Sequence, residues 1–190
     1  MKTIISSKEN ITIINKSKFI CLLYKINKLE DVNNYLNITK DKYKGATHYC
    51  YAYILDNFKK CSDDKEPSGT AGLPILNVLE KNELNYVLCI VVRYFGGIKL
   101  GTGGLTRAYS GSVLECLKDN IIDIKKGLKL ELTFTYDKVN LIDNLFKNII
   151  DKAFDENIKY TILISYEDYE LIKDKLNDID IEVIEENIII

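Results

Sequence analysis

The segment from Arg93 to Arg107 has the residue types of an anion-binding loop. It is rich in glycine, which lets backbone N–H groups come close to a ligand. A helix is expected directly after it, and the first turn of a helix offers unpaired N–H donors and the positive end of the helix dipole. We therefore predict that an anion or a partner is bound by Arg93, Lys99, Gly101, Thr102, Gly103, Gly104 and Arg107. The alternative is a tight strand-to-helix crossover that packs against a neighbouring sheet.

The unusual residue types of the chain lie in one block. Nine of the ten glycines, both prolines, both arginines and the only histidine fall between Gly45 and Gly111. Lysine is the usual cation elsewhere, so we expect Arg93 and Arg107 at positions that require the planar, forked guanidinium group, which lysine lacks. This block is therefore where we expect the function to reside.

An acidic loop precedes the glycine-rich segment. Asp63, Asp64 and Glu66 lie within four positions, and their oxygens could hold Mg²⁺. They could instead pair with the arginines, or cap the helix expected to begin near Thr70. Capping and ion pairing are the commoner outcome for such a run, so we predict no metal site. The loop is expected to support the anion site through Asp63, Asp64, Glu66, Ser68 and Thr70.

His48 is the only candidate for acid–base catalysis. Histidine is the residue type that changes charge near neutral pH, although a lone histidine is more often structural. It lies on an expected strand whose alternation places it with Cys50, opposite the row Tyr49, Tyr51 and Tyr53. The tyrosine row could stack nucleic-acid bases, but a packed aromatic face is the expected role. We further expect one side of the domain to gather His48, Asp63, Asp64, Glu66, Arg93 and Arg107.

These residues must be positioned by an α+β fold. Apolar periodicity and turn residues predict two domains, 1–125 and 126–190, with the boundary near 123–127. The first domain is expected to hold a strand or hairpin at 10–26, a helix at 29–43, a strand at 46–54, a polar loop at 61–68, a helix at 70–79, a buried central strand at 86–94, a glycine loop at 95–104 and a helix at 105–118. The second should follow the βαββαβ order of a ferredoxin-like unit, with strands at 128–136, 153–158, 160–166 and 181–189 and helices at 139–150 and 167–176.

The composition narrows the functional class. Residues 1–126 hold 19 lysines and arginines against 13 acidic residues, whereas residues 127–190 hold 7 against 15. The first half is thus the expected face for a polyanion. The longest strongly apolar run, 87–92, is too short to cross a membrane. Five cysteines without C-x-x-C spacing argue against disulfides or zinc. We expect a soluble, cytoplasmic protein that does not bind membranes.

Three segments of the block resemble the YigZ/IMPACT family. They are the strand 46–53, the loop 62–72 and the segment 92–109, which runs from Val92 through the glycines to Tyr109. Two positions depart from the family: Tyr49 stands where asparagine is usual and Lys65 where glycine is common. The resemblance implies a βαβ-type N-terminal domain like a ribosomal-protein domain and domain IV of elongation factor G. It implies a ferredoxin-like C-terminal domain similar to domain V of that factor.

The resemblance also implies a connection with translation. Eukaryotic relatives restrain a stress-activated translation kinase, but they use an additional N-terminal interaction domain, so we do not carry that role over. We predict a regulatory or binding protein of the translation apparatus whose partner is the ribosome, RNA or a translation factor, with no cofactor. The alternative is an enzyme that acts on a small phosphorylated or nucleotide-like ligand with the help of Mg²⁺. A concave pocket would favour the alternative, and an open face would favour the binding protein.

Overall fold

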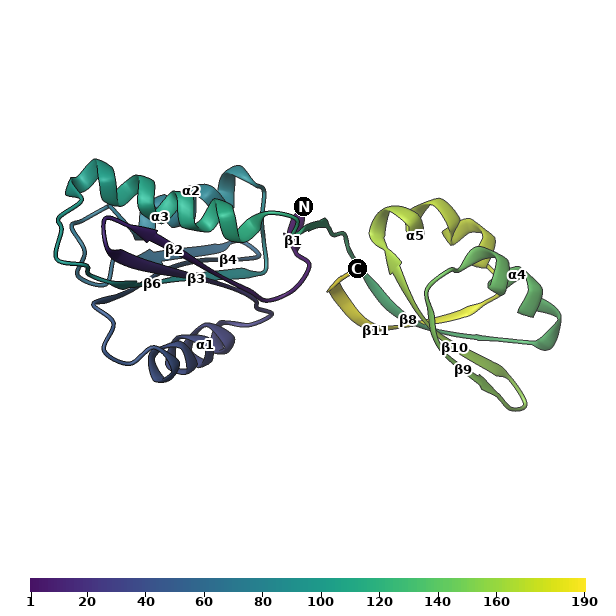
Figure 1. The fold of residues 1–190 in the computed structure, drawn as a ribbon. Helices are drawn as coiled ribbons and strands as arrows, with labels where there is room; N and C mark the ends of the chain where they lie inside the picture. Colours follow the sequence, from purple (N-terminus) through teal and green to yellow (C-terminus); the bar gives the residue numbers. More distant parts are fainter. The chain divides into compact units, whose positions relative to one another are not determined.

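The computed structural model describes residues 1–190 as an α+β chain with three antiparallel sheets and five α-helices (Figure 1). The chain forms two compact units, 1–123 and 124–190. None of its helices combines the length and the apolar character that crossing a membrane would require. Each unit has a hydrophobic core of its own.

The first unit is built around a buried central strand, as the apolar run at 86–94 predicts. This strand, β6, lies in the middle of a five-stranded sheet of order β2-β3-β6-β4-β5, in which every pairing is antiparallel. The elements of the unit are β1 (Lys2–Ile4), β2 (Lys8–Ile14), β3 (Ser17–Lys25), α1 (Leu29–Lys42), β4 (His48–Leu55), β5 (Phe58–Ser62), α2 (Gly72–Lys81), β6 (Val87–Tyr94), α3 (Gly101–Leu117) and β7 (Ile121–Asp123).

Helices cover both faces of this sheet. Figure 1 shows α2 and α3 on one face and α1 on the other. Alternate side chains of β6 therefore enter two different cores: Cys89 and Val91 pack under α2 and α3, whereas Leu88 and Ile90 face α1. Because β3 and β4 both pair with β6, they run parallel to each other, and α1 connects them in the manner of a βαβ crossover.

Several element boundaries differ from the sequence-based prediction. The helix expected at 105–118 already begins at Gly101, and the polar loop expected at 61–68 is shortened because β5 extends to Ser62. The short pair formed by β1 and β7 joins the two ends of the unit and was not predicted. Three-residue strands carry too little alternation to be recognised from sequence.

The second unit has the succession that its pattern predicts. Its four strands have the order β11-β8-β10-β9 and are all antiparallel, which is the order of a βαββαβ unit. The helix expected at 139–150 is wrong in length, because α4 ends at Leu145 and the next strand begins at Ile149. The elements are β8 (Lys126–Phe134), a 3-10 helix (Tyr136–Lys138), α4 (Val139–Leu145), β9 (Ile149–Phe154), β10 (Ile158–Ser165), α5 (Tyr166–Ile172), a 3-10 helix (Lys173–Leu176) and β11 (Asp180–Ile189).

Candidate functional site

A cavity of about 480 Å³ lies where the three singled-out segments of the first unit meet. Its walls come from the start of β4, the loop before α2, the end of β6 and the start of α3. Six predicted site residues line it: His48, Glu66, Arg93, Lys99, Gly101 and Thr102. Lys65 and Phe95 are two further wall residues whose side chains could contact a ligand. The concave arrangement is the one that suits a small ligand or a single group of a larger one.

Arg93 lines this cavity and is buried there in an ion pair with Glu66. Its Nη1 donates to Glu66 Oε1 at 2.6 Å, and its Nη2 donates to Ser17 Oγ at 3.3 Å. The guanidinium carbon lies 5.3 Å and 5.4 Å from the ring centres of Phe19 and Phe95. Arg93 thus lines the cavity while its guanidinium makes the ion pair that was the alternative expectation for the acidic loop. With only 4% of its surface exposed, it supports the cavity through Glu66.

The same carboxylate oxygen takes a second hydrogen bond, from a residue to which sequence reasoning gave no role. The Tyr109 hydroxyl donates to Glu66 Oε1 at 2.8 Å and accepts from Cys50 Sγ at 3.3 Å. Burial raises the pKa of the Cys50 thiol to about 12, so the thiol stays protonated and serves as a donor. Burial likewise raises the pKa of Tyr109. The sequence did contain a signal for this role. Leu105, Tyr109 and Val113 recur at helical spacing and form a buried face, and Tyr109 brings a hydroxyl into it.

The orientation of His48 is fixed by a backbone carbonyl. His48 Nδ1 lies 2.8 Å from the carbonyl oxygen of Asp64, which can only accept, so Nδ1 must carry a proton. The other nitrogen, Nε2, lies 3.7 Å from Glu66 Oε1. In the neutral ring this nitrogen is an acceptor at the cavity wall. His48 is also the direct cross-strand partner of Arg93, so the two residues lie on one face as expected.

The acidic loop caps a helix instead of gathering its carboxylates. Asp63 accepts backbone N–H groups from Gly69, Ala71 and Gly72 at 2.7 to 3.0 Å, which satisfies the start of α2. Asp64 accepts the N–H of Tyr49 at 2.6 Å. With Glu66 on Arg93, the three carboxylates have separate partners, and no group of three metal-binding side chains forms.

The remaining predicted residues of this loop lie outside the cavity. Thr70 is buried, and its hydroxyl donates to the Pro67 carbonyl at 2.6 Å. Ser68 is exposed. The capping and pairing alternative therefore describes this loop better than the Mg²⁺ alternative.

Removing the capping carboxylate should destabilise the first unit in a pH-dependent way. Burial alone would raise the pKa of Asp63, but the three backbone donors outweigh burial and lower the pKa below its ordinary value. A lowered pKa means that the stabilisation is present above about pH 3.9, the value in an unfolded chain, and is lost as the pH falls further. We expect Asp63→Ala to reduce the free energy of unfolding by about 1–2 kcal/mol at pH 7.

The measurement is urea unfolding of the full chain at pH 7 and near pH 3. Asp41→Ala, which removes an exposed carboxylate from α1, is the control. The difference between Asp63→Ala and the parent should shrink at the lower pH. A difference that stays constant would mean that the carboxylate charge is not what stabilises α2.

The start of α3 is free of side-chain caps and opens into the cavity. Gly101 begins the helix with φ of 68°, a conformation that favours glycine, and Leu100 before it provides no capping side chain. The first turn also contains no acidic residue. A 17-residue helix therefore presents its N–H groups beside Lys99, which is exposed. The prediction of an anion site rests on this part of the segment.

Arg107 lies elsewhere, which corrects its expected place in the first turn. Because α3 begins early, Arg107 is in the second turn, is exposed, and does not line the cavity. Its guanidinium lies over Gly103: a Cβ built on that glycine would be 3.5 Å from Arg107 Nη1. Gly103 and Gly104 are likewise absent from the cavity wall.

The crossover alternative applies to the beginning of the segment. A Cβ added to Gly96 would lie 2.1 Å from the backbone carbon of Lys16, so this glycine lets two backbones touch. Its N–H donates to Ser17 Oγ at 3.2 Å. The segment thus combines a packing glycine at 96 with an open helix start at 101.

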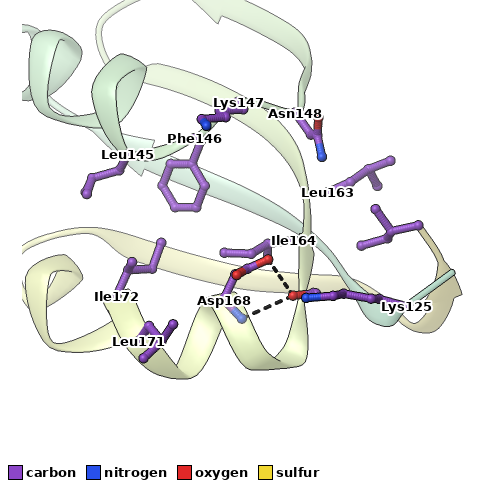
Figure 2. A pocket seen from close by; sticks show the side chains of 12 residues that line it. Lys125, Leu145, Phe146, Lys147, Asn148, Leu163, Ile164, Asp168, Leu171 and Ile172 are labelled. Carbon is purple, nitrogen blue, oxygen red and sulfur yellow. Dashed lines mark hydrogen bonds between the residues drawn. The ribbon is translucent and has the colours of Figure 1, made fainter. Parts of the chain in front are cut away.

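Another cavity, of about 370 Å³, lies in the second unit and contains none of the predicted residues. Figure 2 shows its mainly apolar wall, with Phe146, Leu171 and Ile172 facing the hollow and Lys125 at its edge. The dashed lines mark the N-cap of α5, where Ser165 Oγ accepts from Asp168 N and donates to the Asp168 carboxylate. Its wall also contains polar side chains, among them Lys125, Lys147, Asn148 and Asp168, but no histidine or arginine.

Comparisons with known proteins place the site within a described domain. The model of the Impact N-terminal domain matches residues 15–117, which include the whole cavity of the first unit. The chain is 36% identical to the IMPACT family member YvyE of Bacillus subtilis (strain 168) over 171 residues, 88% of this chain and 78% of that protein. It is 32% identical to the IMPACT family member YigZ of Escherichia coli (strain K12) over 157 residues, 80% of this chain and 77% of that protein.

Two solved structures resemble parts or all of the chain. The crystal structure of a hypothetical protein aligns with a TM-score of 0.65 at 25% identity, covering 97% of both chains. A two-domain translational regulator, Yih1, aligns with a TM-score of 0.35 at 18% identity, covering 62% of this chain and 46% of that chain. The second score is too low to establish a common fold.

Proposed function

This chain belongs to the IMPACT family, and we propose that it is a translation-associated protein that binds RNA by holding a phosphate group in the cavity at the start of α3. One observation carries the proposal. The uncapped N-terminus of α3, Lys99 and Lys65 all border the same cavity. Backbone N–H donors and lysine ammonium groups are both common phosphate ligands.

The charges around the cavity favour an anion. Glu66 is the one carboxylate in its wall, and Arg93 neutralises it at 2.6 Å. The lysines at positions 65 and 99 are both exposed, so they can move to meet a ligand. Phe95, 45% exposed in the same wall, offers a ring face to the base or sugar next to the phosphate.

RNA is the proposed source of the phosphate because of the charge of the first unit and the family. The first unit, residues 1–123, carries 17 basic against 13 acidic residues, a small excess that suits a polyanion in a larger assembly. The ribosome supplies such phosphates at high local density. Domain IV of elongation factor G, which the family resembles, is the basis for expecting a role in translation.

Replacing Lys99 should weaken RNA binding and its dependence on salt. We expect Lys99→Gln to lower the affinity of the full chain for a single-stranded RNA oligomer several-fold, and to reduce the slope of log affinity against log salt by about 1. Fluorescence anisotropy at several salt concentrations between about 50 and 200 mM measures both quantities. Lys147→Gln in the second unit is a control of equal charge change. An unchanged slope for Lys99→Gln would remove this lysine from the interface.

Arg107 provides a further check on the placement of the site. The exposed side chain lies outside the cavity, so Arg107→Lys should leave RNA affinity unchanged if the cavity is the binding site. A loss comparable to that of Lys99→Gln would mean that the phosphates follow the outer surface of α3 instead.

A second candidate function is an enzyme that acts on a small phosphorylated ligand. Two observations favour it: the site is a concave cavity, which is the arrangement expected of an enzyme, and His48 Nε2 lies at its wall, 3.7 Å from Glu66 Oε1. Calorimetric titration with nucleoside mono- and diphosphates, with and without Mg²⁺, tests it. Saturable binding that His48→Gln abolishes would support the enzyme, whereas binding to RNA alone would favour the binding protein.

A further inference from the structure

We infer that the α1 side of strands β4 and β5 is a second RNA contact, at which unpaired bases stack on tyrosine side chains. This surface is on the face of the sheet opposite the cavity. This surface binds the bases of the RNA, whereas the cavity of the proposed function holds a phosphate group. The choice of RNA as its nucleic acid rests on that proposed function, whereas the stacking chemistry does not.

Strand register places three tyrosines of β4 beside one phenylalanine of β5 on the same face. Tyr49, Tyr51 and Tyr53 alternate along β4 and contribute to the α1-side core, whereas Cys50 and Ala52 point to the other core. On β5, Lys60 is the direct partner of Tyr53, and Phe58 is the partner of Leu55. Directly paired residues share a face, so Phe58 and Lys60 extend the same surface.

Helix α1 covers the middle of this face but leaves its β5 edge open. The buried residues of the α1-side core come mainly from β3, β6 and α1 itself, and β5 contributes none of them. Phe58 is 65% exposed, Lys60 is exposed, and Tyr51 and Tyr53 are half-buried. We call these four residues, Tyr51, Tyr53, Phe58 and Lys60, the tyrosine shelf.

The chemistry of the shelf suits single-stranded RNA. Tyr51 and Tyr53 are two residues apart on one strand, a spacing of about 6.7 Å, so neighbouring rings can each take one base. Aromatic rings stack with every base, and a nearby lysine can hold the connecting phosphate. The side chains that β4 and β5 direct to this face are Tyr49, Tyr51, Tyr53, Leu55, Phe58, Lys60 and Ser62, and none is acidic.

Duplex RNA does not fit this surface in the same way. Its bases are already stacked on one another and are not free to lie on protein rings. The exposed edge of the sheet therefore selects unpaired segments such as loops and ends. A protein partner is the outcome that would remain if nucleic acid fails to bind.

The experiment uses the full chain and an RNA octamer that carries 2-aminopurine at a central position. Stacking on tyrosine should quench the fluorescence of the probe on binding. We expect Tyr51→Ala and Tyr53→Ala each to lower affinity about tenfold, equivalent to about 1.4 kcal/mol, and to abolish much of the quenching. Tyr51→Phe and Tyr53→Phe keep the ring and should retain both. Tyr136→Ala, which removes an exposed tyrosine from the second unit, should change neither.

Two further variants keep the test independent of folding and of the cavity. Lys60→Glu changes an exposed side chain, so it should preserve the fold and still lower affinity at least tenfold. Lys99→Gln should weaken binding but leave the quenching at saturation intact. Unchanged affinity and quenching in the Tyr51, Tyr53 and Lys60 variants, or equal competition by duplex RNA, would overturn the shelf. Loss in those variants with no effect of Lys99→Gln would overturn the cavity and leave the shelf standing.

Discussion

Replacing Glu66 by alanine is expected to lower the free energy of unfolding by about 3–5 kcal/mol, because it leaves a buried guanidinium without its counter-charge. Arg93 Nη1 lies 2.6 Å from Glu66 Oε1, and the two side chains are 5% and 3% exposed. Tyr109 would lose its acceptor at the same time. Urea unfolding of the full chain measures the change.

A double variant distinguishes the loss of the ion pair from the loss of buried side-chain volume. Replacing both partners by apolar residues of similar size, Glu66→Leu with Arg93→Met, should cost clearly less than Glu66→Ala alone, since no unpaired charge remains. Glu83→Ala is the control, because it breaks an exposed pair with Lys2 and should change the free energy little. If Glu66→Ala costs no more than this control, Arg93 must be stabilised by groups other than Glu66.

The second large effect is expected at Gly96, where a methyl group has no room. Gly96→Ala should lower the free energy of unfolding by about 3 kcal/mol or more, above the usual range for an overfilled site. The clash is with the backbone of Lys16 and Ser17 at 2.1 to 2.4 Å, which cannot rotate away as a side chain would. The substitution should also weaken RNA binding, since it displaces the segment that leads to Lys99.

Gly111 offers a matched control within the same chain. It lies inside α3, and a Cβ added there would meet nothing within 4 Å. Gly111→Ala should therefore stabilise the protein by up to about 1 kcal/mol through its better helix propensity. Thermal and urea unfolding of the two variants should change in opposite directions. Equal effects would indicate that the contact between Gly96 and the β2–β3 turn is not tight.

Strong local patterns made much of the fold predictable. The apolar run at 86–94 indicated a central strand because only a strand covered on both faces can bury every side chain. Alternation along 46–54 correctly separated His48 from the tyrosine row, since successive side chains of a strand point to opposite faces. The βαββαβ order of the second unit followed from the same reasoning, although α4 is shorter than its periodicity indicated.

The start of α3 could not be predicted, because its sequence argues against a helix. Gly101, Gly103 and Gly104 are poor helix formers, so the pattern favoured a loop. In the structure Leu105, Tyr109 and Val113 pack into the core between α3 and the sheet, and the helix that they anchor begins four residues earlier, at Gly101. Local propensity was overridden by packing that no short window contains.

The ion-pair partner of Arg93 could not be predicted from the sequence either. Three carboxylates were available, and the path of the loop decides which of them meets the arginine. Asp64 and Lys65 both have positive φ, 40° and 68°, and this turn directs Glu66 inward while Asp63 stays at the helix start. The resemblance described above implies glycine at position 65, and glycine is the residue type that this conformation favours.

The strand order of the first unit has a consequence for how fast the protein can fold. The central strand β6 pairs with β3 and β4, and the β3 pairing joins residues as distant as Lys18 and Tyr94. The β1–β7 pair joins Lys2 to Asp123. Bringing residues this far apart in sequence into contact has a high entropic cost of loop closure, and this cost slows folding. During synthesis, β6 is made after both outer hairpins, so the edges of β3 and β4 that it pairs with stay unpaired until then and are open to aggregation.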